Sequence, residues 1–77
     1  MICSLTNKSD LPLMVDFVCG QRVMLRPQQK LIYEDSITYP TPTTWVLVEH
    51  GLLEDEDELD FPSLGVSTKH NWMLEGF

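Results

Sequence analysis

Residues 11–34 read Leu-Pro-Leu-Met-Val-Asp-Phe-Val-Cys-Gly-Gln-Arg-Val-Met-Leu-Arg-Pro-Gln-Gln-Lys-Leu-Ile-Tyr-Glu, and this stretch decides the fold. Side chains of one kind recur at every second position, which is the period of a β-strand. Turn-forming residues at Gly20-Gln21 and at Pro27-Gln28-Gln29 interrupt the alternation. The stretch therefore predicts three consecutive antiparallel strands, near residues 13–18, 22–26 and 30–34.

The alternation also predicts which side chains face the core. Leu13, Val15 and Phe17 share one face of the first strand, and Val23 and Leu25 share one face of the second. In the third strand we expect Leu31 and Tyr33 to point inward.

The pattern continues on both sides of this stretch. Residues 2–6 form a plausible first strand, and Asn7-Lys8-Ser9-Asp10 has the composition of a turn. Residues 39–43, with two prolines, indicate a stiff extended linker. Residues 44–50 are rich in β-branched and aromatic side chains, so we predict a central strand there, ended by Gly51.

These elements predict one small all-β domain over residues 1–77, since the chain is too short for two. The expected fold is a small antiparallel sandwich or a partly open barrel of about five to six short strands with extended loops. Residues 1–50 would form the main sheet, residues 51–60 an acidic loop, and residues 61–77 an irregular apolar C-terminal segment.

The charge narrows the classes of partner. Twelve acidic residues against five basic ones give a net charge of −7, which argues against binding nucleic acid or an anionic membrane. Such a chain suits a basic protein surface. The start of the sequence does not read as a signal peptide, and no stretch has the length of a membrane span. We therefore expect a cytoplasmic site of synthesis, with Cys3 and Cys19 as thiols rather than a disulfide.

The acidic run is the most concentrated charge in the chain. Its members are Glu54, Asp55, Glu56, Asp57, Glu58 and Asp60. A solvated loop is the simplest interpretation, and a docking patch for a basic surface is the alternative. The run lacks the central glycine and the alternation of a calcium-binding EF-hand loop. We predict no metal there.

Reactive groups are present but not organised for catalysis. Cys3, Cys19, His50 and His70 lie too far apart for the usual spacing of a zinc site. The sequence has no nucleophile elbow, no glycine-rich phosphate loop and no metalloprotease helix motif. We therefore expect a protein that is not an enzyme and needs no cofactor.

The C-terminal segment carries most of the remaining apolar residues. Trp72, Met73, Leu74 and Phe77 lie near its end, and Phe61 and Leu64 precede them. Tryptophan and methionine are enriched at the centres of protein interfaces. Two interpretations remain open: a last strand that closes the domain's own core, or an arm that docks on a neighbouring subunit. In the second case these six residues form the partner-binding site.

Residues 5–34 also carry a resemblance. Their order is an Asn-x-Ser-Asp turn, a strand, a short turn, a strand, Leu-x-Pro-x-x and another strand. This order resembles small β-sandwich and barrel accessory proteins of bacteriophage virions, such as capsid decoration, head-fibre and tail-accessory proteins. The resemblance implies a non-enzymatic structural protein located in the virion. Its partners would be larger virion subunits or copies of itself.

A different class of function is the alternative hypothesis. A small acidic inhibitor of a host protein, such as an anti-CRISPR protein or a DNA mimic, presents carboxylates where a basic groove expects phosphates. A mimic needs its acids spread along one face, whereas half of the acids here lie in one run. The charge layout therefore favours the structural role. A cellular interaction module is a third hypothesis.

Overall fold

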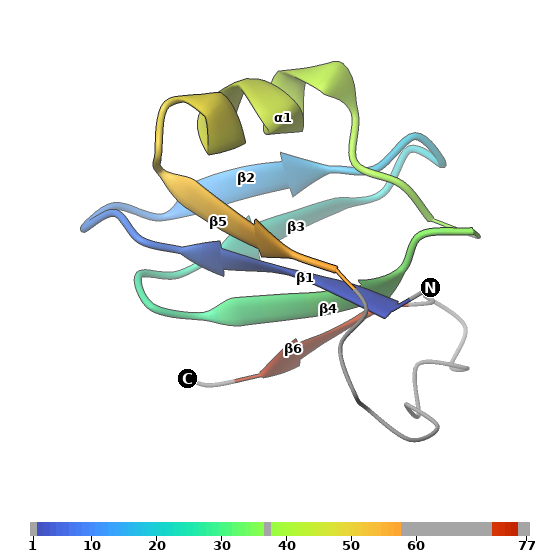
Figure 1. Ribbon diagram of the computed structural model, residues 1–77, viewed down its shortest axis with the longest axis horizontal. Helices are drawn as coiled ribbons and strands as arrows, with labels where there is room; N and C mark the ends of the chain where they lie inside the picture. Colours follow the sequence, from blue (N-terminus) through green and yellow to red (C-terminus); the bar gives the residue numbers. More distant parts are fainter. Residues whose placement is uncertain (1, 37, 58–71, 76–77) are drawn as a thin grey trace.

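A computed structural model describes residues 2–36, 38–57 and 72–75. Within them, a four-stranded antiparallel sheet has the order β5-β1-β4-β6, and β2 and β3 form a separate antiparallel hairpin (Figure 1). The predicted all-β class and open antiparallel architecture are confirmed. The elements are β1 (Ile2–Asn7), β2 (Leu13–Asp16), β3 (Arg22–Leu25), β4 (Lys30–Glu34), α1 (Pro42–Glu49), β5 (Leu53–Glu56) and β6 (Trp72–Glu75).

The core lies between the hairpin and the four-stranded sheet. Leu5 of β1 stands opposite Leu31 of β4, and Val15 of β2 stands opposite Val23 of β3, with all four side chains buried. The inward faces that the alternation predicts for β2, β3 and β4 are therefore confirmed. The buried cluster comprises Cys3, Leu5, Val15, Phe17, Val23, Leu25, Leu31, Tyr33 and Leu53.

The buried side chain of Asn7 holds the corner where the chain leaves one sheet for the other. Its Nδ2 donates to the carbonyl oxygens of Leu11 at 2.8 Å and Leu25 at 2.9 Å. Its Oδ1 accepts from the backbone N–H and the hydroxyl of Ser9, both at 2.8 Å. The predicted turn at residues 7–10 therefore also joins β1 to the end of β3.

The strand predicted at residues 44–50 is wrong, because these residues form most of helix α1. Pro42 begins the helix, at a position where its missing N–H is not needed. Gly51 ends it with φ +79°. There the N–H of Leu52 donates to the oxygen of Leu47 and that of Gly51 to Val48, both at 3.0 Å. This pair of bonds is a Schellman C-terminal motif, which outweighs the strand propensity of the β-branched residues.

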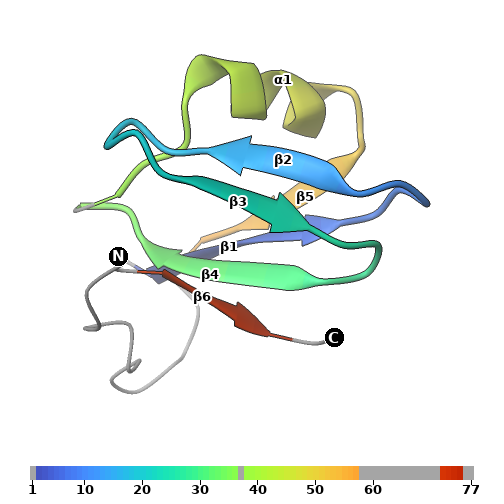
Figure 2. The same cartoon turned by 180° about the vertical axis from the view of Figure 1, so that it is seen from behind.

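Helix α1 lies across the opening between β2, at the edge of the hairpin, and β5, at the edge of the larger sheet (Figures 1 and 2). Trp45, Leu47 and Val48 of the helix pack against the core cluster. The helix therefore closes one side of the sandwich, which the sequence assigned to a strand.

The acidic loop predicted at residues 51–60 is also different in the structure, because part of it is a strand. Leu53–Glu56 form strand β5, which pairs antiparallel with β1, so that Leu5 stands opposite Asp55 and Ser4 opposite Glu56. The buried side chain of Leu53 anchors this strand to the core. Backbone pairing and one apolar anchor thus order the first half of a run that its charge alone would keep extended in solvent.

Candidate functional site

The outer face of the hairpin carries an exposed pair of apolar side chains next to the ion pair of Asp16 and Arg22. Met14 of β2 and Met24 of β3 stand directly opposite each other, and their side chains are 40% and 50% exposed. Val18 and Leu11, beyond the two ends of β2, are also exposed. Figure 2 views the molecule from the hairpin side, where no other described element covers β2 and β3. We call Met14 and Met24 the methionine pair.

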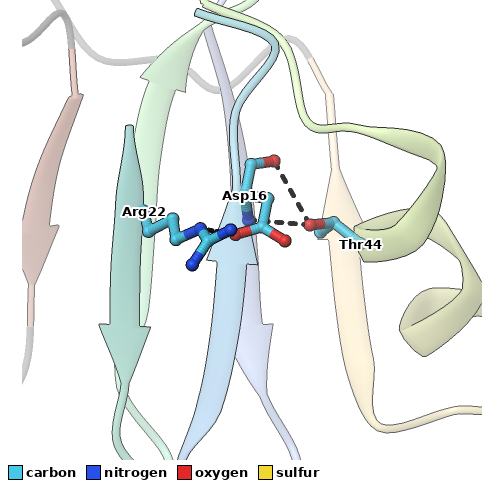
Figure 3. Close-up of polar contacts among 3 residues, drawn as sticks. All are labelled: Asp16, Arg22 and Thr44. Carbon is cyan, nitrogen blue, oxygen red and sulfur yellow. Dashed lines mark hydrogen bonds and ion pairs between the residues drawn. The ribbon is translucent and has the colours of Figure 1, made fainter. Parts of the chain in front are cut away.

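The hairpin is fixed to the helix beside the methionine pair (Figure 3). The hydroxyl of Thr44 accepts the Asp16 N–H at 2.9 Å and donates to the Asp16 carbonyl at 3.2 Å. The Asp16 carboxylate lies 3.3 Å from Nε of Arg22, which is largely exposed. Because the pair is near solvent, it contributes little to stability, and the backbone contact with Thr44 is the stronger link.

A cavity of about 350 Å³ lies where Trp45 of the helix meets residues of β1, β4 and β5. This volume lies at the lower end of the range for small-molecule binding pockets. Three aromatic rings, three carboxylates and one thiol line it: Tyr33, Tyr39, Trp45, Asp35, Asp55, Asp57 and Cys3. Tyr33 and Cys3 are buried and form its inner wall, whereas Tyr39, Asp55 and Asp57 are exposed at its rim. We call it the acidic aromatic pocket.

The two-residue period of β5 determines the side to which two of these carboxylates point. Leu53 points into the core, so Asp55 and Asp57 continue on the same side of the chain and reach the pocket. Glu54 and Glu56 alternate to the other side, where Glu54 lies 3.6 Å from Nζ of Lys8. In the described part of the run, aspartates therefore face the pocket and glutamates face away from it.

Two ring contacts shape the aromatic walls. The Tyr39 and Trp45 rings are tilted, with centroids 5.7 Å apart, and those of Phe17 and Tyr33 lie 5.8 Å apart. Such tilted pairs are favoured arrangements of aromatic rings. Nε1 of Trp45 is buried and has no hydrogen-bond partner among the described residues. Aromatic rings and carboxylates thus line the same pocket.

The ionisation of the Cys3 thiol is disfavoured in the fold. Burial raises its pKa to about 12, and a hydrogen bond to Asp57 and the charge of Asp35 act in the same direction. Burial, and then the charge and hydrogen bond of Cys3, raise the pKa of the Tyr33 hydroxyl. Because the thiolate is the nucleophilic form of cysteine, Cys3 stays an inert thiol at neutral pH. It forms no disulfide with Cys19.

The predicted acidic patch is thus split by the structure. Glu54, Asp55 and Glu56 lie in β5, and Asp57 follows it. Glu58 and Asp60 lie outside the described residues. The docking-patch hypothesis now involves two distinct faces, and the aspartate face borders a cavity.

The predicted partner-binding residues of the tail are only partly described. Strand β6 pairs with β4 of its own chain. Trp72 packs against the core cluster, and its Nε1 donates to Oε1 of Gln21 at 2.9 Å. Leu74 is 39% exposed, and Met73 is placed by its backbone opposite Ile32. Phe61, Leu64 and Phe77 lie outside the described residues. The tail's role in binding a partner stays a prediction.

Sequence reasoning missed both surfaces described above. The methionine pair was readable from the alternation, which places Met14 and Met24 on the face away from Val15 and Val23. The acidic aromatic pocket was not readable in this way, because Trp45 reaches it only from a helix.

Other kinds of site find little support in the described part of the chain. No group of three or more His, Cys, Asp or Glu side chains there is placed to hold a metal ion. Among the described residues, no helix combines the length and the apolar character that crossing a membrane requires. Comparisons with protein families, with curated proteins and with solved structures find no match to this chain.

Proposed function

We propose that this chain is a non-enzymatic assembly protein, an accessory component of a bacteriophage particle that acts as a decoration, cement or connector element. The observation that carries the proposal is the methionine pair on the outer face of the hairpin. Two methionines that stand opposite each other in solvent form a small exposed apolar surface on an acidic domain.

The physical argument is one of burial. Exposed apolar side chains gain about 25 cal/mol for each Å² that a partner removes from water. Methionine suits such a surface, because its flexible and polarizable side chain adapts to the partner's shape. The hydrogen bonds between Thr44 and Asp16 hold the hairpin on the helix, so the surface is presented by a rigid body.

The charge layout supports assembly over mimicry of nucleic acid. A mimic requires carboxylates along one face, whereas the alternation of β5 sends Glu54 and Glu56 to one side and Asp55 to the other. Acids divided in this way suit solubility on one side and a local contact on the other.

Incorporation into particles tests the proposal. The phage that encodes the chain is purified, and the copy number of the chain per particle is measured by quantitative mass spectrometry. A Met14→Ser/Met24→Ser double variant supplied in place of the wild type should fold normally, since both side chains are exposed. We expect its copy number to fall at least about ten-fold, the effect of losing about 1.4 kcal/mol of binding free energy.

Val46→Ser is the matched control, because Val46 is an exposed apolar side chain on the helix, away from the hairpin face. This variant should be incorporated like the wild type. Particles that lack the wild-type chain, or that take up the methionine double variant at the wild-type level, would contradict the proposal.

A further inference from the structure

We infer that the acidic aromatic pocket is a binding site for an arginine side chain of a protein partner. The inference rests on the proposed function in one respect, namely that the chain acts by binding another protein. It concerns a different surface, since the pocket is lined from β1, β4, β5 and α1 and the segments that follow β4 and β5, whereas the methionine pair lies on the hairpin.

The first argument is charge. Asp35, Asp55 and Asp57 line one cavity, and no Lys, Arg or His is among the described residues that line it. Asp55 and Asp57 are both exposed at the rim of this cavity, and their carboxylates attract a cation that enters it. The charge of the rim therefore favours a positively charged ligand.

The second argument separates a metal ion from an organic cation. A metal ion needs carboxylate oxygens that converge to within about 2.6 Å of one point, and no described trio is arranged in this way. The cavity is much larger than one ion, at about 350 Å³. Tyr39 and Trp45 supply ring surface that a hydrated metal ion does not use, but on which an organic cation is attracted by the π-system.

The third argument selects guanidinium over ammonium. Guanidinium is planar, stacks on aromatic rings and can hydrogen-bond to several carboxylates at once through five N–H donors. Both kinds of partner line the pocket, namely the Tyr39 and Trp45 rings and the carboxylates of Asp55 and Asp57. An ammonium is a compact point charge and would satisfy fewer of them.

A titration with small probes tests this assignment without a macromolecular partner. The indole N–H signal of Trp45 is followed by NMR in the full chain while Nα-acetylarginine amide is added. We expect a saturable shift with a Kd of about 1–10 mM, because a single side chain makes few contacts. Nα-acetylcitrulline amide, the neutral analogue of similar shape, should produce no saturable shift, and Nα-acetyllysine amide should bind more weakly than the arginine compound.

The strand itself provides a matched pair of variants. Asp55→Asn/Asp57→Asn and Glu54→Gln/Glu56→Gln remove the same charge from neighbouring positions of one exposed segment, but from opposite sides of it. The aspartate variant should weaken arginine binding about five-fold or more, and the glutamate variant should stay within about two-fold of the wild type. Tyr39→Leu, at a side chain that is 48% exposed, should weaken binding about three-fold by removing one π-face.

Several results would overturn the inference. These are the absence of a saturable shift with the arginine compound, equal binding of the citrulline compound, tighter binding of the lysine compound, or equal losses in the two acidic double variants. None of these results bears on incorporation through the methionine pair, and failure of that incorporation leaves the small-probe titration unaffected. The two proposals therefore fail separately.

Discussion

The hydroxyl of Thr44 forms two hydrogen bonds with the backbone of Asp16, accepting its N–H at 2.9 Å and donating to its carbonyl at 3.2 Å (Figure 3). Thr44 is fully buried in the first half of α1, and Asp16 ends β2. The same carbonyl also accepts the N–H of Thr41 at 2.9 Å. A helix side chain thus satisfies backbone groups at the edge of the hairpin, where a neighbouring strand would otherwise do so.

Replacing Thr44 by valine should therefore destabilise the fold. Valine keeps the shape of the side chain but leaves the Asp16 N–H without its partner, a loss of about 1–3 kcal/mol in the free energy of unfolding. Urea denaturation followed by circular dichroism measures it. Thr43→Val, at an exposed position of the same helix, should change the free energy by less than about 0.5 kcal/mol. Equal stabilities of the two variants would contradict the role given to Thr44.

The hairpin could be predicted from the sequence because its pattern is local, whereas the helix depends on contacts between distant segments such as the one between Thr44 and Asp16. The strands near residues 13–18, 22–26 and 30–34 follow from a period that each segment carries alone. Val46 and Val48 favour a strand locally, yet contacts with β2 and β5 and the two helix ends decide otherwise. The signal for those ends was present, since Pro42 and Gly51 stand where helices tend to begin and end.

The acidic aromatic pocket could not be predicted for a related reason. Asp55 and Tyr33 come together only because β1 pairs with both β4 and β5, and Trp45 joins them from the helix. Neither the pairing of distant strands nor the placement of the helix is encoded by a local period. The sequence identified the acidic run, but not which of its carboxylates share a cavity.

Asn7 should be among the least replaceable residues in the chain. Asn7→Ala leaves the carbonyls of Leu11 and Leu25 without their amide donor, and we expect a loss of about 2–4 kcal/mol. That loss approaches the whole stability of a domain of this size. Asn7→Asp should be at least as damaging at pH 7, because a carboxylate would face both carbonyl oxygens.

Thermal unfolding monitored by circular dichroism measures both Asn7 variants. Asp10→Ala, an exposed change in the same turn, is the control and should unfold close to the wild-type temperature. If Asn7→Ala behaves like the control, the corner does not depend on the side-chain amide.

Gly51→Ala should weaken the end of the helix. Gly51 has φ +79°, a conformation that costs a residue with a Cβ about 1 kcal/mol. An added Cβ would meet nothing within 4 Å, so backbone strain alone sets the expected loss of about 1 kcal/mol in urea denaturation. Gly51→Asn should recover part of it, because asparagine tolerates this conformation better. A loss several times larger would mean that a steric clash contributes.

The two thiols should differ sharply in reactivity. Cys19 is exposed and Cys3 is buried, with a pKa raised to about 12 by burial first and then by Asp57. At pH 7.5, iodoacetamide should label Cys19 at least about 100-fold faster than Cys3, because the thiolate is the reacting form. Mass spectrometry of peptides from the native protein measures both rates, and labelling in urea should equalise them. Comparable native rates would contradict the buried position of Cys3.

The raised pKa of Cys3 also predicts a loss of stability in alkali. The thiol is favoured in the fold, so the unfolded chain releases its proton first, near pH 9. The contribution is complete below that pH and declines as pH rises toward about 12, by up to about 1.4 kcal/mol per pH unit. Cys3→Ala removes this term. The difference in unfolding free energy between wild type and variant should therefore shift by about 2 kcal/mol against the wild type between pH 8 and pH 10.5. Cys3→Ala also removes the part of the Tyr33 pKa rise that Cys3 causes, which shifts the difference in the same direction. Parallel profiles in urea denaturation would therefore contradict the prediction.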